Sequence, residues 1–325
     1  MVYPILLPDR VELLVTLPSG LKRYTVPVGS EEIIRDIRVF RQYLEKPESQ
    51  EYLVYAQKLY ESLVRPYVND LENSNINTLV FLPHGSLHSI PLAALHDGEK
   101  FLIQKYALAV TSSLSLIDPK SLDRSAAPKI LLAGLSESVQ GFPALGAVRE
   151  ELSAIQNLYG GVMLLDQDFT LERFENALRD TDVSIVHIAS HGSFTGNQNG
   201  NFLLTYDGKL SMDRLRQSIG IAKFRKNPVE LLVLSACETA AGDDRAALGL
   251  AGVALKAGAR SAMGSLWVIS DEGTALLIEE FYKQLKDPSV SKAKALQKAQ
   301  NKLIEKEGFQ HPFFWSPYLM INNWL

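Results

Sequence analysis

Apolar residues in the first third of the chain are grouped into short runs and two stretches of helical spacing. Residues 11–28 are typical of a β-hairpin, because two alternating runs flank the turn residues Pro18-Ser19-Gly20. In two later stretches apolar side chains recur every three or four residues, which is the period of an amphipathic helix. The elements predicted after the hairpin are helices over residues 33–44 and 53–63, a buried strand at Leu79–Leu82 and a strand over 101–111.

A different pattern begins after residue 128. Near-continuous apolar runs of strand length alternate there with amphipathic stretches. The predicted strands cover residues 130–135, 162–165, 183–189, 230–236 and 313–321, and the predicted helices cover 145–158, 171–178, 244–257, 271–286 and 289–306. Strands that are apolar on both faces and alternate with helices are typical of a parallel sheet between two helical layers. The sequence therefore predicts an α/β fold for this part.

The segment between the two patterns, Asp118–Pro128, is predicted to be a domain boundary. It is polar, rich in small residues and bounded by proline, as linkers between domains commonly are. We therefore expect an N-terminal lobe over residues 1–125 and a second domain over residues 126–325.

Two of the predicted parallel strands end in residues that can do chemistry. One strand reads S-I-V-H-I-A-S-H-G and ends with His191 and Gly192, and the other reads E-L-L-V-L-S-A-C-E-T and ends with Cys237. In an open parallel sheet, reactive groups gather just beyond the carboxyl ends of the strands. If the two strands are neighbours, the imidazole and the thiol lie side by side.

This pair of residues is suited to nucleophilic catalysis on an amide. A free thiol has a pKa of about 8.5, so a thiolate nucleophile needs a nearby base at neutral pH. His191 can accept the thiol proton and later donate it to the leaving amine. The backbone N–H groups of Gly192 and Cys237 can form an oxyanion hole, because glycine lets its N–H approach a substrate carbonyl. The predicted reaction is hydrolysis of a peptide bond.

Each residue of the pair also has a structural interpretation. A lone cysteine after an apolar strand is commonly a small buried hydrophobe, and a lone histidine there is commonly structural. Their occurrence together at matching strand ends favours the catalytic pair. His187 and His191 have an H-x-x-x-H spacing, but four residues along a strand span about 13 Å, so we expect His187 in the core and no zinc pair. His84 and His88 repeat this spacing in the first lobe and are predicted to be turn and hairpin residues.

Composition narrows the classes of protein that the chain can belong to. The 325 residues are 46% hydrophobic and 22% charged, with a net charge of −4 and no basic stripe, which argues against a nucleic-acid partner. No apolar run reaches the length of a membrane span, and we expect neither a span nor a secretory signal. Cys237 is the only cysteine, which excludes a disulfide within the chain and a structural thiolate zinc site and favours the reducing cytosol.

Several motifs resemble the CHAT family of caspase-like domains. They are A-S-H-G, L-S-A-C-E-T and A-G-A-R-S-A-M-G-S-L-W-V-I-S-D in the second domain, and F-L-P-H-G-S-L-H-S-I-P-L-A-A-L in the first lobe. The resemblance implies a mostly parallel sheet flanked by helices, preceded by a degenerate, pseudo-caspase lobe. It also implies that His191 and Cys237 are the catalytic dyad and that no metal or cofactor takes part. A more distant likeness extends to caspases, separase and legumain.

The resemblance further implies that activity depends on another component. Members of this family are often fused to tetratricopeptide repeats, and an appended repeat region or a bound protein commonly controls them. No such repeat is visible in this sequence.

The expected substrate pocket differs from that of caspases. Caspases carry Q-A-C-[RQG]-G around the nucleophile, whereas this chain has S-A-C-E-T, so specificity for aspartate at P1 does not carry over. Glu238 or Asp271 is a candidate for the P1 pocket, where a carboxylate would favour a basic P1 residue; Asp271 also suits a helix N-cap. Ser265, Leu266 and Trp267 are candidate walls of the substrate groove, or alternatively part of an edge strand with a core tryptophan.

The function expected from the sequence is that of a cytosolic cysteine endopeptidase that cleaves a few specific proteins. A scaffold that binds protein partners without cutting them is the alternative, although a decayed site usually loses one member of the dyad. A third interpretation is an amidohydrolase that acts on a small molecule through the same dyad.

Overall fold

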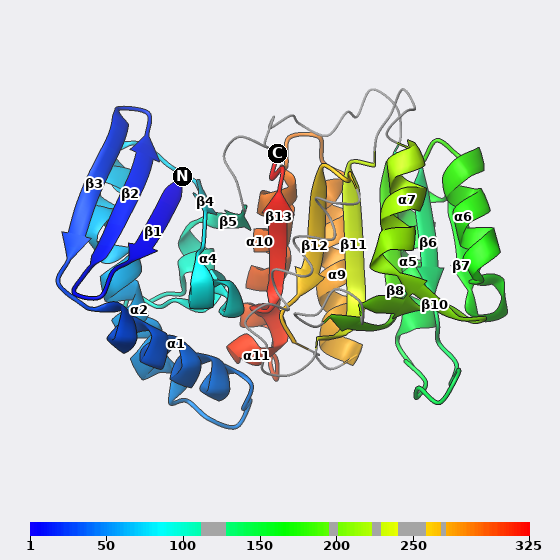
Figure 1. Cartoon of the computed structure of the whole chain (residues 1–325), viewed down its shortest axis with the longest axis horizontal. Helices are drawn as coiled ribbons and strands as arrows, with labels where there is room; N and C mark the ends of the chain where they lie inside the picture. The colour runs from blue at the N-terminus through cyan, green and yellow to red at the C-terminus, as the bar shows by residue number, and fades with distance from the viewer. Residues whose placement is uncertain (112–127, 195–200, 223–228, 240–257, 268–270) are drawn as a thin grey trace.

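The part of the chain that the computed structural model describes forms one continuous sheet of 13 strands with helices packed against it (Figure 1). The structure describes residues 1–111, 128–194, 201–222, 229–239, 258–267 and 271–325. The main path of the sheet has the order β10-β9-β8-β11-β12-β13-β5-β4-β1-β2-β3. The two remaining strands branch off at β8, since β6 pairs with β8 and β7 pairs with β6. Within the described ranges, no helix is both long and apolar enough to cross a membrane.

The described residues from 128 onward, which we call the second half of the chain, supply the strands that carry the predicted site. The parallel strands are β6 (Ile130–Gly134), β7 (Val162–Leu165), β8 (Ile185–Phe194), β11 (Leu231–Thr239) and β12 (Ser261–Ser265). β13 (Tyr318–Asn322) runs antiparallel to β12, and the hairpin of β9 (Phe202–Leu204) and β10 (Lys209–Ser211) joins the end of β8. The predicted α/β fold with a mostly parallel sheet is confirmed.

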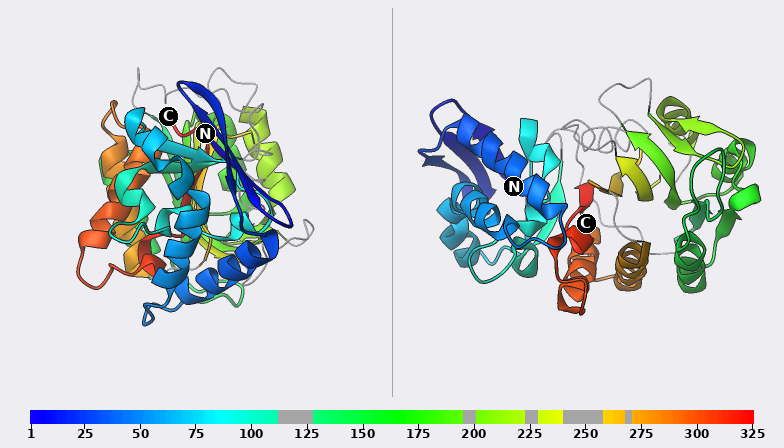
Figure 2. Two further views of the ribbon diagram at one scale, coloured as in Figure 1. Left: turned by 90° about the vertical axis from the view of Figure 1, so that its left-hand side faces the viewer. Right: turned by 90° about the horizontal axis from the view of Figure 1, so that it is seen from below.

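Helices cover both faces of this sheet. Neighbouring residues of a strand point to opposite faces, and in these strands the residues on both faces are mostly apolar and buried. The helices of this half are α5 (Val148–Tyr159), α6 (Leu171–Asp180), α7 (Met212–Ala222), α9 (Asp271–Leu285), α10 (Lys292–Glu305) and α11 (Pro312–Trp315). Leu132 and Val233 pack in one core with α5, α9 and α10. Their neighbours Leu131 and Leu232 pack in a second core with α6 and α7. Figure 2 shows these helical layers on either side of the strands.

A glycine allows α5 to approach the sheet closely. At Gly134, the last residue of β6, an added Cβ would lie 2.8 Å from a Val148 methyl group and 2.9 Å from a Leu152 methyl group, both on α5. It would also lie 2.9 Å from the carbonyl oxygen of Ala189 in β8. Such contacts are too short for a packed interior, so the glycine fixes how near α5 lies to β6 and β8.

Residues 1–111, which we call the first half of the chain, extend the sheet at its other end. Its elements are β1 (Val2–Leu6), β2 (Val11–Leu17), β3 (Gly20–Val26), α1 (Ser30–Leu44), α2 (Tyr52–Leu63), η1 (Arg65–Tyr67), α3 (Val68–Asn73), β4 (Thr78–Phe81), η2 (Gly85–Ser89), η3 (Leu92–Ala94), α4 (Leu102–Lys105) and β5 (Ala107–Val110). β1 lies between β4 and β2, so the N-terminal hairpin of β2 and β3 completes the sheet.

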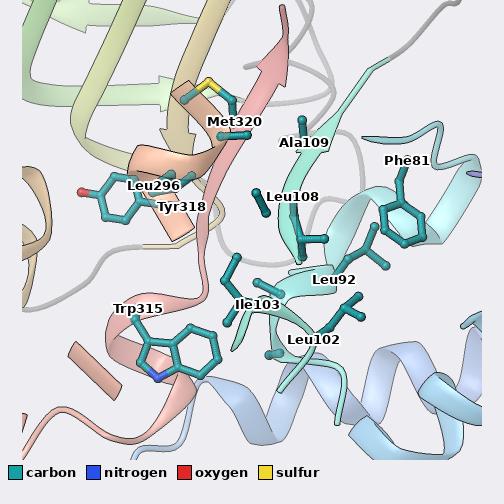
Figure 3. Packing of buried hydrophobic residues seen from close by; sticks show 14 of the residues in the cluster. Phe81, Leu92, Leu102, Ile103, Leu108, Ala109, Leu296, Trp315, Tyr318 and Met320 are labelled. Atoms are coloured by element: carbon teal, nitrogen blue, oxygen red, sulfur yellow. The ribbon is translucent and has the colours of Figure 1, made fainter. Parts of the chain in front are cut away.

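The two halves meet where β13 pairs with β5, at Ile321 and Val110. Figure 3 shows buried side chains from both halves packed together at this junction, among them Leu108 and Tyr318. Helix α10 crosses the junction, and the buried Gln297 side chain donates a hydrogen bond of 2.6 Å to the Ile103 carbonyl of the first half. The predicted linker lies almost entirely outside the described residues, so the division into domains 1–125 and 126–325 stays a prediction.

Most predicted elements are confirmed, and two are wrong. The strand predicted over 101–111 is instead the short helix α4 followed by β5, and the strand predicted over 313–321 is α11 followed by β13. In both places a side chain accepts a hydrogen bond from a backbone N–H at the start of the short helix, which stabilises the helix start. Gln104 accepts from Phe101 N, and His311 accepts from Phe313 N. The sequence did not predict α3, β9, β10, α7 and the 3₁₀ helices, and the helix predicted over 244–257 lies outside the described residues.

Candidate active site

His191 and Cys237 lie at the same level of two adjacent parallel strands. Ala189 of β8 is opposite Ala236 of β11, and Ser193 is opposite Glu238. Between these two pairs, β11 has only Cys237, whereas β8 has three residues with His191 in the middle. The backbone of β8 therefore bulges at the histidine, opposite the cysteine. The side chain of Cys237 lies outside the described residues, so the dyad itself stays a prediction.

A second irregularity in β11 comes just before Cys237. The pairing with β8 shifts between Leu234 and Ala236, which leaves Ser235 as an extra residue. The Tyr318 hydroxyl of β13 donates a buried hydrogen bond of 3.0 Å to the Ser235 carbonyl, reaching past β12. A bulge next to a candidate nucleophile changes the direction of the strand there, and Tyr318 fixes this bulge.

The His191 ring is held by the loop that follows β6. Its Nε2 is 2.8 Å from the carbonyl oxygen of Pro143, and its ring centroid is 5.1 Å from that of Phe142. A carbonyl can only accept, so Nε2 carries the hydrogen and donates it. In the neutral ring, Nδ1 is then the nitrogen with the free lone pair, which is the form required of a base. His191 is 9% exposed.

Asp166 holds this loop in place. Its Oδ1 accepts the backbone N–H groups of Ser136 and Glu137 at 2.6 and 3.1 Å, and its Oδ2 accepts from the Ser136 hydroxyl and from Arg149, both at 2.7 Å. The residue is 5% exposed and has a φ of 52°, in the left-handed region that few residues other than glycine, asparagine and aspartate adopt. Asp166 thus fixes the start of the segment that presents Phe142 and Pro143 to His191.

The tip of the same loop is a tight two-residue turn. Val139 and Phe142 pair through two backbone hydrogen bonds of 3.2 and 2.9 Å, and the residues between them, Gln140 and Gly141, have φ values of 53° and 83°. Two positive φ values in a row match the right-handed twist of a hairpin. The Gln140 side chain also donates to the Thr205 carbonyl at 2.9 Å, which ties the tip to the β9–β10 hairpin.

His187 lies in the core, as predicted, and belongs to a buried polar network. Its Nε2 is 2.8 Å from Glu151 Oε1 of α5, and its Nδ1 is 3.1 Å from the Tyr282 hydroxyl of α9. Burial raises the pKa of Tyr282 well above its usual range, so the hydroxyl keeps its proton and can donate it to Nδ1. Nε2–H then donates to Glu151. The network joins both helices to β8 four residues before His191.

The other predicted site residues lie at the same end of the sheet. Gly192 is buried in β8 and is opposite Leu203 of β9. Glu238 is in β11 and Asp271 is the first residue of α9, but their side chains lie outside the described residues. Ser265 ends β12, and Ser265, Leu266 and Trp267 are 4–5% exposed. β12 lies between β11 and β13, so the alternative is wrong about an edge strand, but it is right about the tryptophan, because Trp267 is buried in the core.

Sequence reasoning missed the residues that hold the site together: Pro143, Asp166, Glu151, Tyr282 and Tyr318. A backbone carbonyl such as that of Pro143 leaves no mark in a sequence. Glu151 did leave a signal, because it is an acidic residue beside Val148, Leu152 and Ile155 in the apolar stripe of α5. A carboxylate in such a stripe is expected to have a buried donor.

We expect Asp166→Asn to loosen His191. Asparagine tolerates a positive φ but loses the charge that accepts from Arg149, so the free energy of unfolding should fall by about 1–2 kcal/mol. The Nε2–H of His191, observed by ¹⁵N-edited NMR, should lose its protection from solvent exchange because the Pro143 carbonyl is no longer fixed.

Asp97→Asn is the matched control for this variant. Asp97 Oδ1 likewise accepts two backbone N–H groups, from Glu99 and Lys100, and its Oδ2 pairs with Lys105. Burial acts to raise the pKa of Asp97, but these hydrogen bonds outweigh it and lower the pKa to about 2. This variant should lose similar stability and keep the His191 signal. Retention of the signal in Asp166→Asn would show that the loop does not depend on Asp166.

Comparison with known proteins gives the same family as the sequence motifs. The CHAT domain model matches residues 53–323. No curated protein matches the sequence. The fold is similar to that of gingipain R (RGPB) of Porphyromonas gingivalis, an Arg-specific cysteine proteinase, with a TM-score of 0.54 and 11% identity over 90% of this chain and 74% of that chain.

The fold is also similar to separase in the Saccharomyces cerevisiae separase–securin complex. One structure of that complex has a TM-score of 0.56 and 10% identity, covering 99% of this chain and 29% of that chain. Another has a TM-score of 0.51 and 13% identity, covering 89% and 20%. At these identities the likeness is one of fold. Since the matched region is most of the sequence, this chain belongs to the CHAT domain family and has the α/β fold of these caspase-like proteases.

Proposed function

We propose that this chain is a cysteine endopeptidase that cleaves specific protein substrates. The observation that carries the proposal is the pairing of β8 with β11, in which Cys237 is opposite the bulge centred on His191. The orientation of the His191 ring supports it, because Nε2 donates to Pro143 and leaves Nδ1 available as a base.

The proposed reaction begins with transfer of the Cys237 proton to His191 Nδ1. The thiolate sulfur attacks the carbonyl carbon of the scissile amide, and the backbone N–H groups of Gly192 and Cys237 bind the resulting oxyanion. His191 returns the proton to the leaving amine as the C–N bond breaks. A water molecule, deprotonated by His191, then hydrolyses the thioester and releases the acid and the thiol. This scheme needs no metal or cofactor.

The proposed specificity is for a basic residue at P1. Glu238 follows the nucleophile directly, and a carboxylate there or at Asp271 would bind an arginine or lysine side chain through charge-assisted hydrogen bonds. Gingipain R, which has a similar fold, is Arg specific. We place the enzyme in the cytosol, with a repeat region or a protein partner as its regulator.

Alkylation of the thiol tests the proposal, since Cys237 is the only cysteine and its labelling by iodoacetamide is unambiguous. The wild type should react with an apparent pKa below the value of about 8.5 of a free thiol, and His191→Ala should restore that value. His84→Ala removes an exposed histidine outside the site and should leave the profile unchanged. An identical profile for the wild type and His191→Ala would refute the dyad.

A scaffold that binds protein partners without cleaving them is the competing proposal. It predicts an unactivated thiol in the wild type, so the same pH profile separates the two functions.

A further inference from the structure

The two residues after β12 are held by three contacts, two of them to the stretch that contains α11 and precedes β13. The Leu266 N–H donates to the Pro317 carbonyl at 3.0 Å, and the Trp267 indole N–H donates to the Phe313 carbonyl at 3.1 Å. Both side chains are buried. This segment continues β12, the neighbour of β11, at the end of the sheet where Cys237 lies. The sequence predicts that Ser265, Leu266 and Trp267 form a wall of the substrate groove of the proposed endopeptidase.

The third contact comes from Arg41, on helix α1 of the first half. Its Nη2 donates to the Leu266 carbonyl at 2.8 Å, and its Nη1 donates to the Ser89 carbonyl of η2 at 2.5 Å. The guanidinium carbon is 4.5 Å from the centroid of the Trp267 ring. Glu45, the residue that directly follows α1, pairs with its Nε. The Arg41 side chain is 21% exposed, so these contacts are partly screened from water.

These contacts require an arginine. The planar guanidinium donates in two directions from its edge to two carbonyls while its face stacks on an indole. A lysine ammonium keeps the charge but has neither the two fixed, diverging N–H donors nor the flat face of the guanidinium. The contact also links distant parts of the chain, because α1 precedes residues 53–323, which match the family model.

We propose that Arg41 is a positioning residue for the substrate groove, through which the N-terminal helix α1 sets the place of Leu266 and Trp267. This inference rests on the proposed function and on the predicted role of that segment as a wall of the groove that binds the substrate peptide. Arg41 does not touch the reacting atoms. Its loss is therefore expected to change how tightly a peptide binds and not how fast the thiol reacts once the peptide is bound.

The test compares Arg41→Met with Arg65→Met. Arg65 makes the same kinds of contact elsewhere: it lies 4.9 Å from the centroid of the Tyr60 ring, donates to the Asp97 carbonyl at 3.2 Å and pairs with Glu61. The probe is a tripeptidyl acyloxymethyl ketone with arginine at P1. For Arg41→Met, its inhibition constant should rise about tenfold, with the maximal rate of inactivation unchanged, while Arg41→Lys should lie between this variant and the wild type. Arg65→Met should match the wild type.

Hydrogen exchange gives a second measurement that needs no activity. Amide exchange in the peptide covering residues 258–267 should be faster in Arg41→Met than in the wild type and unchanged in Arg65→Met. Unchanged exchange in Arg41→Met, or an unchanged inhibition constant despite faster exchange, would overturn the inference. Iodoacetamide separates this failure from a failure of the proposed function, because an unactivated wild-type thiol counts against the dyad whatever Arg41 does.

Discussion

Replacing Cys237 by alanine is expected to abolish cleavage of protein substrates, by a factor of about 10⁴ or more. The chain has no other thiol, so the variant has no group that can form the thioester. The substitution removes one sulfur atom at the end of a strand, so the free energy of unfolding should stay within about 1 kcal/mol of the wild-type value. Proteomic mapping of cleavage sites with the two proteins measures activity and P1 preference together, and urea unfolding measures stability.

Cys237→Ser is the matched variant for this experiment. A serine hydroxyl nearly preserves the size of the side chain but is a much poorer nucleophile at neutral pH, so it should be almost as inactive as alanine. Full turnover by Cys237→Ala would rule out the mechanism. A wild type that cleaves nothing, even together with activating partners, would favour the scaffold.

The largest effect on stability is expected for His187→Leu. The leucine leaves the Glu151 carboxylate, which is 3% exposed, without its histidine donor. Removing one partner of a buried pair costs about 3–5 kcal/mol because the other is left uncompensated. The free energy of unfolding from urea titration should fall by this amount. The apparent pKa for alkylation of Cys237 should also move toward the value of about 8.5 of a free thiol, because β8, which carries His191, loses its hydrogen bonds to α5 and α9.

A double variant identifies the cause of this loss. His187→Leu combined with Glu151→Leu removes both members of the pair, so it should be more stable than His187→Leu alone. His311→Leu serves as the comparison, since His311 is also buried but bonds only to backbone groups, the Ser49 carbonyl and the Phe313 N–H. If the double variant lost as much free energy of unfolding as His187→Leu and Glu151→Leu lose together, the network would contribute little beyond packing.

The sequence predicts this fold well where the information is local. The apolar runs that end at His191 and Cys237 define two buried strands, and their order in an α/β pattern makes them candidates for neighbours. The prediction is wrong where aromatic residues dominate, as at Phe313, Phe314 and Trp315. Such residues favour strands, yet Pro312 at the first helical position and the His311 cap turn the segment into α11.

The surroundings of the candidate site depend on contacts between residues distant in the sequence. Pro143 reaches His191 across 48 positions, and Arg41 reaches Leu266 across 225. Neither contact follows from periodicity, because each is decided by which distant segments meet at the end of the sheet. The buried position of Glu151 in α5 is the kind of irregularity that sequence reasoning can detect, although the identity of its partner requires the three-dimensional structure.

The pairing of β13 with β5 also affects how this protein behaves as it is made and handled. If the two halves separated, each would expose a strand whose N–H and C=O groups had lost their partners. Such strands are templates for joining other chains, so a partly folded or truncated form would be prone to self-association. Keeping both halves in one polypeptide gives each strand its partner at high local concentration, which is expected to oppose such self-association.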